Sequence, residues 1–143
     1  MSKRTTLAVL LAFVALLTFD RPAVAHHSFA AEFDGNQPIT VSGSVSRMDW
    51  VNPHSWIYVD VKDASGQVVQ WRFEMGPPNA LLRMGWRKSS VPPGTMVKIE
   101  GYRAKSGKNV ANAKTVTLPD GRELFSGGSA PSGLTEGAGA TKP

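Results

Sequence analysis

The chain contains no cysteine, so neither a disulfide nor a thiolate metal site can be built from its 143 residues. Histidine is scarce as well, with three in the whole chain. The Gly-x-Ser-x-Gly, His-Glu-x-x-His and phosphate-loop motifs are missing, which removes the familiar signatures of several hydrolase and nucleotide-binding classes. The fold must therefore be stabilised by packing, and a metal site must use histidine, methionine, carboxylate or backbone ligands. An enzymatic function would rest on such a metal alone.

Long apolar runs are also lacking, apart from one at residues 7–19. Lys3 and Arg4 precede this run, and Ala23 and Ala25 stand where a signal peptidase requires small residues. The run is shorter than the roughly 20 residues that cross a bilayer as a helix, which argues against a retained anchor. We therefore expect residues 1–25 to be a Sec-type signal peptide and the mature protein to be periplasmic or secreted, without a membrane span.

A rival cleavage site follows Ala30, because Ser28 and Ala30 are also small. Cleavage there would remove two of the three histidines. It would also leave an unusually long spacer after the apolar run, so cleavage after Ala25 is favoured.

The remaining chain has the size and composition of one small domain. The formal net charge of the whole chain is +5, part of it in the signal segment, and this mild excess does not predict a nucleic-acid partner. We expect a leader at 26–37, a folded domain at 38–125 and a disordered tail rich in Gly, Ser and Ala at 126–143.

Alternation of apolar and polar residues predicts five strands and one short helix. The alternation changes phase near Arg47, which predicts a β-bulge there. The expected strands are 39–50, 56–62, 68–75, 96–102 and 111–118, the helix is 79–84, and 123–125 are a candidate for a short final strand.

Three strands, a helix and two further strands are the order found in a five-stranded oligonucleotide/oligosaccharide-binding (OB) barrel. We therefore predict an all-β chain with one short helix and an OB-like barrel. A small β-sandwich is the alternative.

The histidines predict a metal site. After the favoured cleavage, His26 is the first residue, and its α-amine and Nδ1 can chelate one metal ion. A second imidazole opposite completes a plane of three nitrogens, the histidine brace, which suits Cu(II) best. His54 is the natural second imidazole, His27 is the alternative, and Met48 or Met75 could add a thioether. The competing interpretation is that His26 and His27 form a flexible end and His54 is a hydrogen-bonded turn residue.

A second candidate site is an aromatic face on the second and third strands, which carry the usual ligand face of such barrels. Trp56 and Tyr58 should point outward there, with Arg72 beside them, and could stack a ring of a small organic ligand. Alternatively, Phe29 and Phe33 of the leader cover the two aromatic rings.

Basic residues gather on the expected loop and strand near residue 110, and they could bind an anion. A solvated loop is the commoner explanation, and an exported protein rarely meets single-stranded nucleic acid. The residues concerned are Arg103, Lys105, Lys108 and Lys114.

Three motifs carry a resemblance to a known family. They are His-His-Ser-Phe at 26–29, Trp-Val-Asn-Pro-His at 50–54 and Gly-Pro-Pro-Asn-Ala-Leu at 76–81. With these motifs the chain resembles a family of small exported bacterial proteins that is catalogued as a domain of unknown function. The resemblance implies a periplasmic or secreted location and brings no activity, cofactor or site residue.

The leading hypothesis is a periplasmic, non-catalytic small barrel that binds copper through His26, His54 and His27. Delivery, buffering or sensing would be its role. The second hypothesis is a module that binds a small organic ligand or a periplasmic protein partner at Trp56, Tyr58 and Arg72. An oxidative copper enzyme ranks last, because so small a domain offers little shaped substrate surface.

Overall fold

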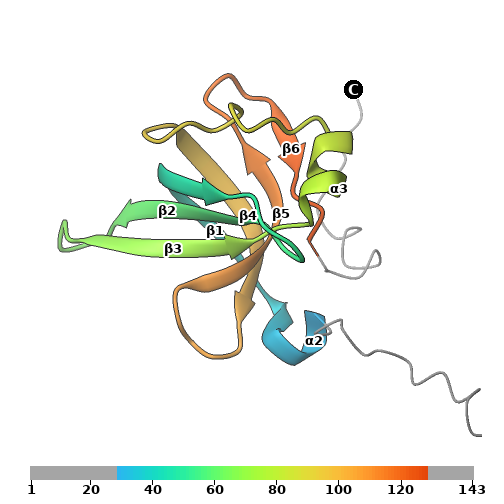
Figure 1. The fold of residues 1–143 in the computed structure, drawn as a ribbon. Coiled ribbons are helices and arrows are strands. Elements are labelled where there is room, and N and C mark those ends of the chain that lie inside the picture. The colour runs from blue at the N-terminus through green and yellow to red at the C-terminus, as the bar shows by residue number, and fades with distance from the viewer. Residues whose placement is uncertain (1–28, 129–143) are drawn as a thin grey trace, which may run out of the picture.

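The computed structural model describes residues 29–128, in which six strands and two short helices form an all-β fold (Figure 1). The predicted signal peptide, His26, His27 and the tail from residue 129 lie outside these residues. No helix within 29–128 is long and apolar enough to cross a membrane. The elements are α2 (Phe29–Glu32), β1 (Phe33–Asp49), β2 (Trp56–Lys62), β3 (Val68–Glu74), α3 (Pro78–Arg83), β4 (Met96–Ala104), β5 (Val110–Thr117) and β6 (Glu123–Phe125).

Five of the strands pair in a closed ring. β1 lies between β2 and β4, β3 follows β2, and β5 follows β4, all in antiparallel pairs. A short parallel pairing between β3 and β5 completes the ring, and β6 adds to the outer side of β5. The all-β prediction and the helix between the third and fourth strands are confirmed, and the strands form one sheet, whereas the sandwich alternative needs two.

β1 is long enough to serve two neighbours because it bends at a bulge. Its first part pairs with β4 as far as Ser44, and its second part pairs with β2 as far as Asp49. The register with β2 shifts between Val45 and Arg47, so the predicted bulge is confirmed. A bulge of this kind lets one strand change direction without losing its neighbours.

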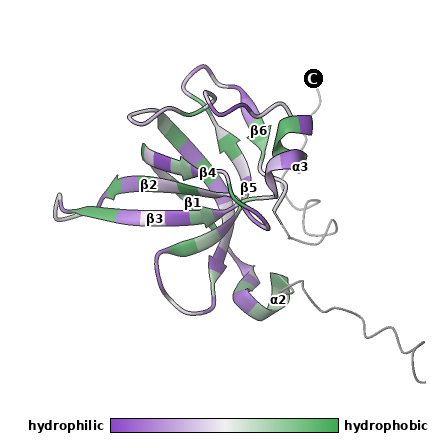
Figure 2. Ribbon diagram, viewed as in Figure 1, coloured by the Kyte–Doolittle hydropathy of each residue, from purple (hydrophilic) through white to green (hydrophobic). Residues whose placement is uncertain are grey.

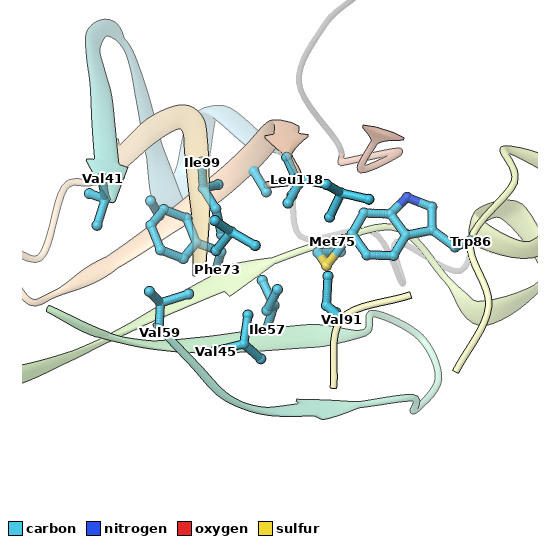
Figure 3. Packing of buried hydrophobic residues seen from close by; sticks show 14 of the residues in the cluster. Val41, Val45, Ile57, Val59, Phe73, Met75, Trp86, Val91, Ile99 and Leu118 are labelled. Carbon is cyan, nitrogen blue, oxygen red and sulfur yellow. The ribbon is translucent and has the colours of Figure 1, made fainter. Parts of the chain in front are cut away.

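The core lies inside the ring and is built from the inward residues of every ring strand. Apolar and polar residues alternate along β2 and β3 in Figure 2, as a half-buried strand requires. Ile57, Phe73 and Ile99 are fully buried, and Trp86 lies beside Met75 at the end of the core (Figure 3).

Two additions to the predicted elements lie in the leader. α2 forms a helix at Phe29–Glu32, and β1 begins at Phe33, so both lie in the segment expected as the leader at 26–37. The ring of Phe29 lies 5.7 Å from that of Phe33 and 5.5 Å from that of Tyr102, measured between centroids. These contacts form a second small apolar cluster, which holds the leader on β4.

Candidate functional site

His54 contacts a buried carboxylate on the neighbouring strand. Its Nδ1 lies 2.7 Å from Oε1 of Glu74, whose residue is 3% exposed, whereas the His54 side chain is 26% exposed. The backbone next to His54 is fixed as well. The Ser55 N–H donates to the Gly76 carbonyl, and the Met75 N–H donates to the Ser55 carbonyl. The imidazole is therefore held by this contact, and about a quarter of the His54 side chain stays exposed to solvent.

This contact determines which ring nitrogen is available. In the neutral ring, Nδ1–H donates to the carboxylate, and Nε2 keeps its lone pair. Metal-bound histidines commonly donate their second ring nitrogen to a carboxylate in this way, which fixes the tautomer and the ring orientation. The Glu74 contact therefore leaves Nε2 as the nitrogen of the neutral His54 ring that keeps a lone pair.

The predicted copper site takes its other nitrogens from His26 and His27, which lie outside the described residues. Within 29–128, no group of three or more His, Asp or Glu side chains is gathered closely enough to hold a metal ion.

A second feature, a cavity of about 350 Å³, lies between α2, the start of β2, β3 and the turn that joins β4 to β5. Trp56 and Arg72 line it, and the Arg72 guanidinium carbon lies 5.1 Å from the centroid of the Trp56 ring. The same cavity is lined by Lys105 and Lys108 from the turn. Two residues of the predicted aromatic face thus come together with two of the predicted basic cluster.

Tyr58, the third residue of that predicted face, does not line this cavity. Although it is the direct cross-strand partner of Arg72, its ring is covered by Arg47, whose guanidinium carbon lies 3.5 Å from the ring centroid. Arg47 also pairs with Asp49 at 3.4 Å. Desolvation of Arg47 opposes its charged form, yet contacts with Tyr58 and Asp49 leave its pKa above the usual value, so it stays charged.

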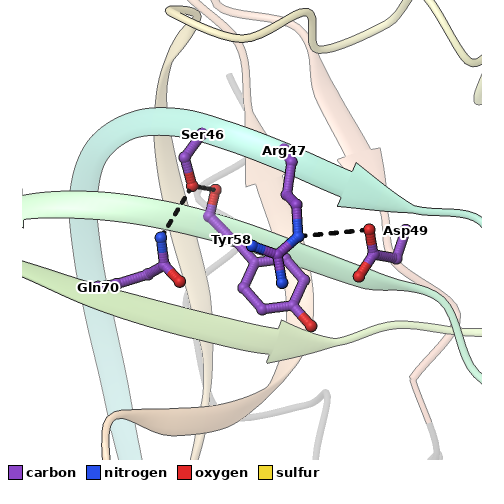
Figure 4. A network of polar contacts seen from close by, with 5 residues as sticks. All are labelled: Ser46, Arg47, Asp49, Tyr58 and Gln70. Atoms are coloured by element: carbon purple, nitrogen blue, oxygen red, sulfur yellow. Dashed lines mark hydrogen bonds and ion pairs between the residues drawn. The ribbon is translucent and has the colours of Figure 1, made fainter.

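Further hydrogen bonds hold the strands beside Tyr58 together. Ser46 donates its hydroxyl to the Tyr58 carbonyl, and the amide of Gln70 donates to Ser46 Oγ at 3.2 Å and to Asp60 at 3.0 Å. Figure 4 shows Tyr58 with Arg47 over its ring and with Ser46 and Gln70 beside it. The predicted face therefore separates into a structural cluster around Tyr58 and a cavity wall at Trp56 and Arg72.

The leader phenylalanines pack on Tyr102, and the Tyr58 ring is covered by Arg47 instead of by them. Phe33 and Trp56 line the same cavity. The leader therefore closes one side of this cavity.

Glu74 is the functional candidate that the sequence alone did not single out. It stands directly opposite Trp56 on β2, and one diagonal step separates it from His54. Alternation along β3 puts Glu74 on the same parity as Gln70 and Arg72, so the sequence carries no signal that this carboxylate is buried.

Comparison with known proteins gives a family but no function. A family model described as a family of unknown function (DUF6152) matches residues 14–113. No curated protein and no solved structure matches the chain. The matched range contains all three histidines, Glu74 and the residues that line the cavity.

Proposed function

This chain belongs to the family of unknown function DUF6152, and we propose that it is an exported, non-catalytic copper-binding protein. His26 and His54 are the main ligands in this proposal, with His27 as a further or alternative ligand. Delivery, buffering or sensing of copper outside the cytoplasm is its role. One observation carries the proposal: the buried carboxylate of Glu74 lies 2.7 Å from Nδ1 of His54.

The closeness of Glu74 and His54 favours a ligand role over a plain turn residue. A buried carboxylate is costly unless it is paired, and here it contacts an imidazole that is still partly exposed. Outer carboxylates of this type raise the basicity of a ligating histidine.

The position of α2 supports an approach of the leader to His54. Phe33 and Trp56 line one cavity, and Trp56 follows His54 by two residues. An extended chain covers about 3.3–3.6 Å per residue, so the three steps from Phe29 back to His26 span roughly 10 Å. The new N-terminus is therefore tethered within that distance of Phe29, which is itself packed on Tyr102.

The chemistry of the processed terminus favours copper. An α-amine with an ordinary pKa of about 8 is readily deprotonated by a competing metal, and it lies on the same residue as an imidazole. Three nitrogen ligands in one plane suit Cu(II), which also stands highest among the divalent metals in general affinity.

The test is a Cu(II) titration of the protein that begins at His26. Electron paramagnetic resonance should show coupling to several nitrogens. One added residue before His26 should abolish the tight site, because the amine then becomes an amide. His54→Ala should weaken binding by at least 100-fold, more than the 10–100-fold that is typical of losing an outer carboxylate.

His27→Ala is the matched comparison. It should have a small effect if His54 is the second imidazole and a large one if His27 takes that place. Equal copper affinity in the processed protein, the extended protein and His54→Ala would overturn the proposal.

A further inference from the structure

The cavity at the junction of β3 and β5 has the size of a small-molecule site. Its volume of about 350 Å³ falls in the range of roughly 300–1,000 Å³ found for ligand pockets. Figure 1 shows α2 and the β4–β5 turn at the same end of the molecule, and the cavity lies between them and the β2–β3 pair.

The charge around the cavity favours an anion. Arg72, Lys105 and Lys108 contribute three positive charges, against one carboxylate at Glu32. Within residues 29–128, neither Arg72 nor Lys108 forms an ion pair. Two side-chain cations thus line one cavity, and neither has a carboxylate partner within residues 29–128.

The cavity walls are held in place by hydrogen bonds. The Lys105 ammonium donates to the Ala30 carbonyl at 2.6 Å, and the Lys105 N–H donates to the Glu32 carbonyl at 2.9 Å. The Arg72 N–H donates to the Asn109 carbonyl at 3.1 Å. The turn is therefore tied both to α2 and to β3, so a ligand would meet a preformed site.

Arg72 is also oriented by its neighbour. Its guanidinium lies over the Trp56 ring, which is a favourable cation–π position. Stacking covers a face of the guanidinium and leaves its N–H edges, the groups that grip a carboxylate or phosphate with two parallel hydrogen bonds.

We infer that this cavity binds a small organic oxyanion, that is, a molecule with a carboxylate or phosphate group. Arg72 and Lys108 contact the charged oxygens, and Trp56 and Phe33 contact the organic part. This site is distinct from the proposed copper ligands and does not depend on them.

The inference is tested with the processed full-length protein, freed of metal by a chelator. Benzoate and phenyl phosphate are titrated, with benzyl alcohol as the neutral counterpart and inorganic phosphate as the anion without a ring. Saturable shifts of the Arg72 side-chain and Trp56 indole signals in nuclear magnetic resonance spectra are expected with at least one organic anion. Benzyl alcohol and inorganic phosphate should bind at least tenfold more weakly.

Variants identify the residues. Arg72→Gln should weaken anion binding about tenfold or more, and Arg72→Lys should restore part of it because it keeps the charge but loses the paired N–H geometry. Lys108→Gln should weaken binding several-fold. Arg122→Gln is the control, since Arg122 pairs with Asp120 in the turn between β5 and β6, and it should leave binding unchanged. Thermal unfolding shows that each variant is folded.

The possible outcomes separate the sources of the ligand. Binding of benzoate alone assigns carboxylates, binding of phenyl phosphate alone assigns phosphate esters, and binding of both supports the shared oxyanion chemistry. Failure of both anions to saturate, equal binding of benzyl alcohol, or equal affinity of Arg72→Gln and Arg122→Gln would overturn the inference. His54→Ala should keep anion binding and Arg72→Gln should keep copper binding, so each proposal can fail alone.

Discussion

The contact between His54 and Glu74 is the residue-scale feature on which the copper proposal depends. A carboxylate that is 3% exposed is energetically costly unless a donor faces it, and His54 supplies one at 2.7 Å. In the neutral ring, the same hydrogen bond leaves Nε2 with a free lone pair. One hydrogen bond thus pairs a buried carboxylate and fixes the orientation of the imidazole that we propose as a ligand.

Glu74→Gln tests this dual role. Glutamine keeps the size and an acceptor oxygen but loses the charge that makes the imidazole a stronger ligand, so Cu(II) affinity should fall about 10–100-fold. A competition titration against a chelator of known affinity measures the change. Glu100→Gln is the control, because Glu100 is partly exposed on β4 and pairs with Lys98. Equal copper affinity in the two variants would contradict the orienting role.

At the residue scale, the sequence identified candidate site residues but not the side chains that they contact. His54, Trp56 and Arg72 were predicted from residue type and strand parity. Glu74 was missed because its relation to His54 depends on the register between β2 and β3, which alternation alone does not fix. Tyr58 was grouped with Trp56 because both have the same parity on β2. Its ring is covered by Arg47, which lies beside the bulge of β1, and the pattern within β2 does not predict that contact.

At the element scale, Trp86 joins the segment after α3 to β6. Its ring is fully buried at the end of the core, and its indole N–H donates to the Phe125 carbonyl at 2.8 Å. β6 has three residues and pairs with β5, so this hydrogen bond adds a link from outside the sheet to a short strand.

Trp86→Phe should lower the free energy of unfolding by about 1–3 kcal/mol, because the Phe125 carbonyl loses its donor and a small void forms. Urea unfolding followed by circular dichroism measures this loss. Trp50→Phe is the control, since Trp50 is only partly buried and its indole makes no hydrogen bond within residues 29–128, and it should cost less. A larger loss for Trp50→Phe would contradict the anchoring role of Trp86.

The turn between β2 and β3 gives a prediction about pH. The Asp63 carboxylate accepts hydrogen bonds from the Ser65 hydroxyl and from the backbone of Ser65 and Gln67, and the Ser65 hydroxyl is the main reason that its pKa is lowered. A lowered pKa in the folded state means that Asp63 stabilises the protein above its unfolded pKa of about 3.9 and loses this effect as the pH falls through the folded value. The stability difference between the natural protein and Asp63→Asn should therefore be larger at neutral pH than near pH 2. Denaturant unfolding at both pH values checks this, and an equal difference would contradict it.

The elements themselves were largely predictable, and the exceptions have one cause. Strands 56–62 and 96–102 showed clear alternation because each has one buried face. α2 and the start of β1 were not predicted, since Phe29 is buried by Tyr102, which lies far along the chain. The pattern of residues within one segment does not predict a contact with a residue so far along the chain.

At the scale of the whole molecule, the closed ring explains how a chain without disulfides encloses a core. β1 is the central strand, and its bend allows β2 and β4 to curve toward each other until β3 meets β5. The order of strands and helix was enough to predict the fold class. The placement of the cavity was not predictable, because it depends on the hydrogen bonds that tie the β4–β5 turn to α2.

Copper should stabilise the whole fold in the processed protein. A ligand that binds only the folded state adds about 2.7 kcal/mol when its free concentration is 100 times the Kd. This corresponds to a rise of several degrees in Tm for a domain of this size. Differential scanning calorimetry with and without Cu(II) measures the rise, and the protein with one added N-terminal residue should show far less. An equal rise in both forms would place the copper elsewhere.

The pairing that closes the ring consists of three residue pairs, which begin at Arg72 and end at Glu74. Such a short junction is where the molecule should open first during partial unfolding, so its amide protons should exchange with deuterium faster than those of the long β1–β4 pairing. Of these residues, Arg72 lines the proposed anion cavity and Glu74 contacts the proposed copper ligand His54. Occupation of either site should therefore slow amide exchange at the β3–β5 pairing and keep the ring of strands closed.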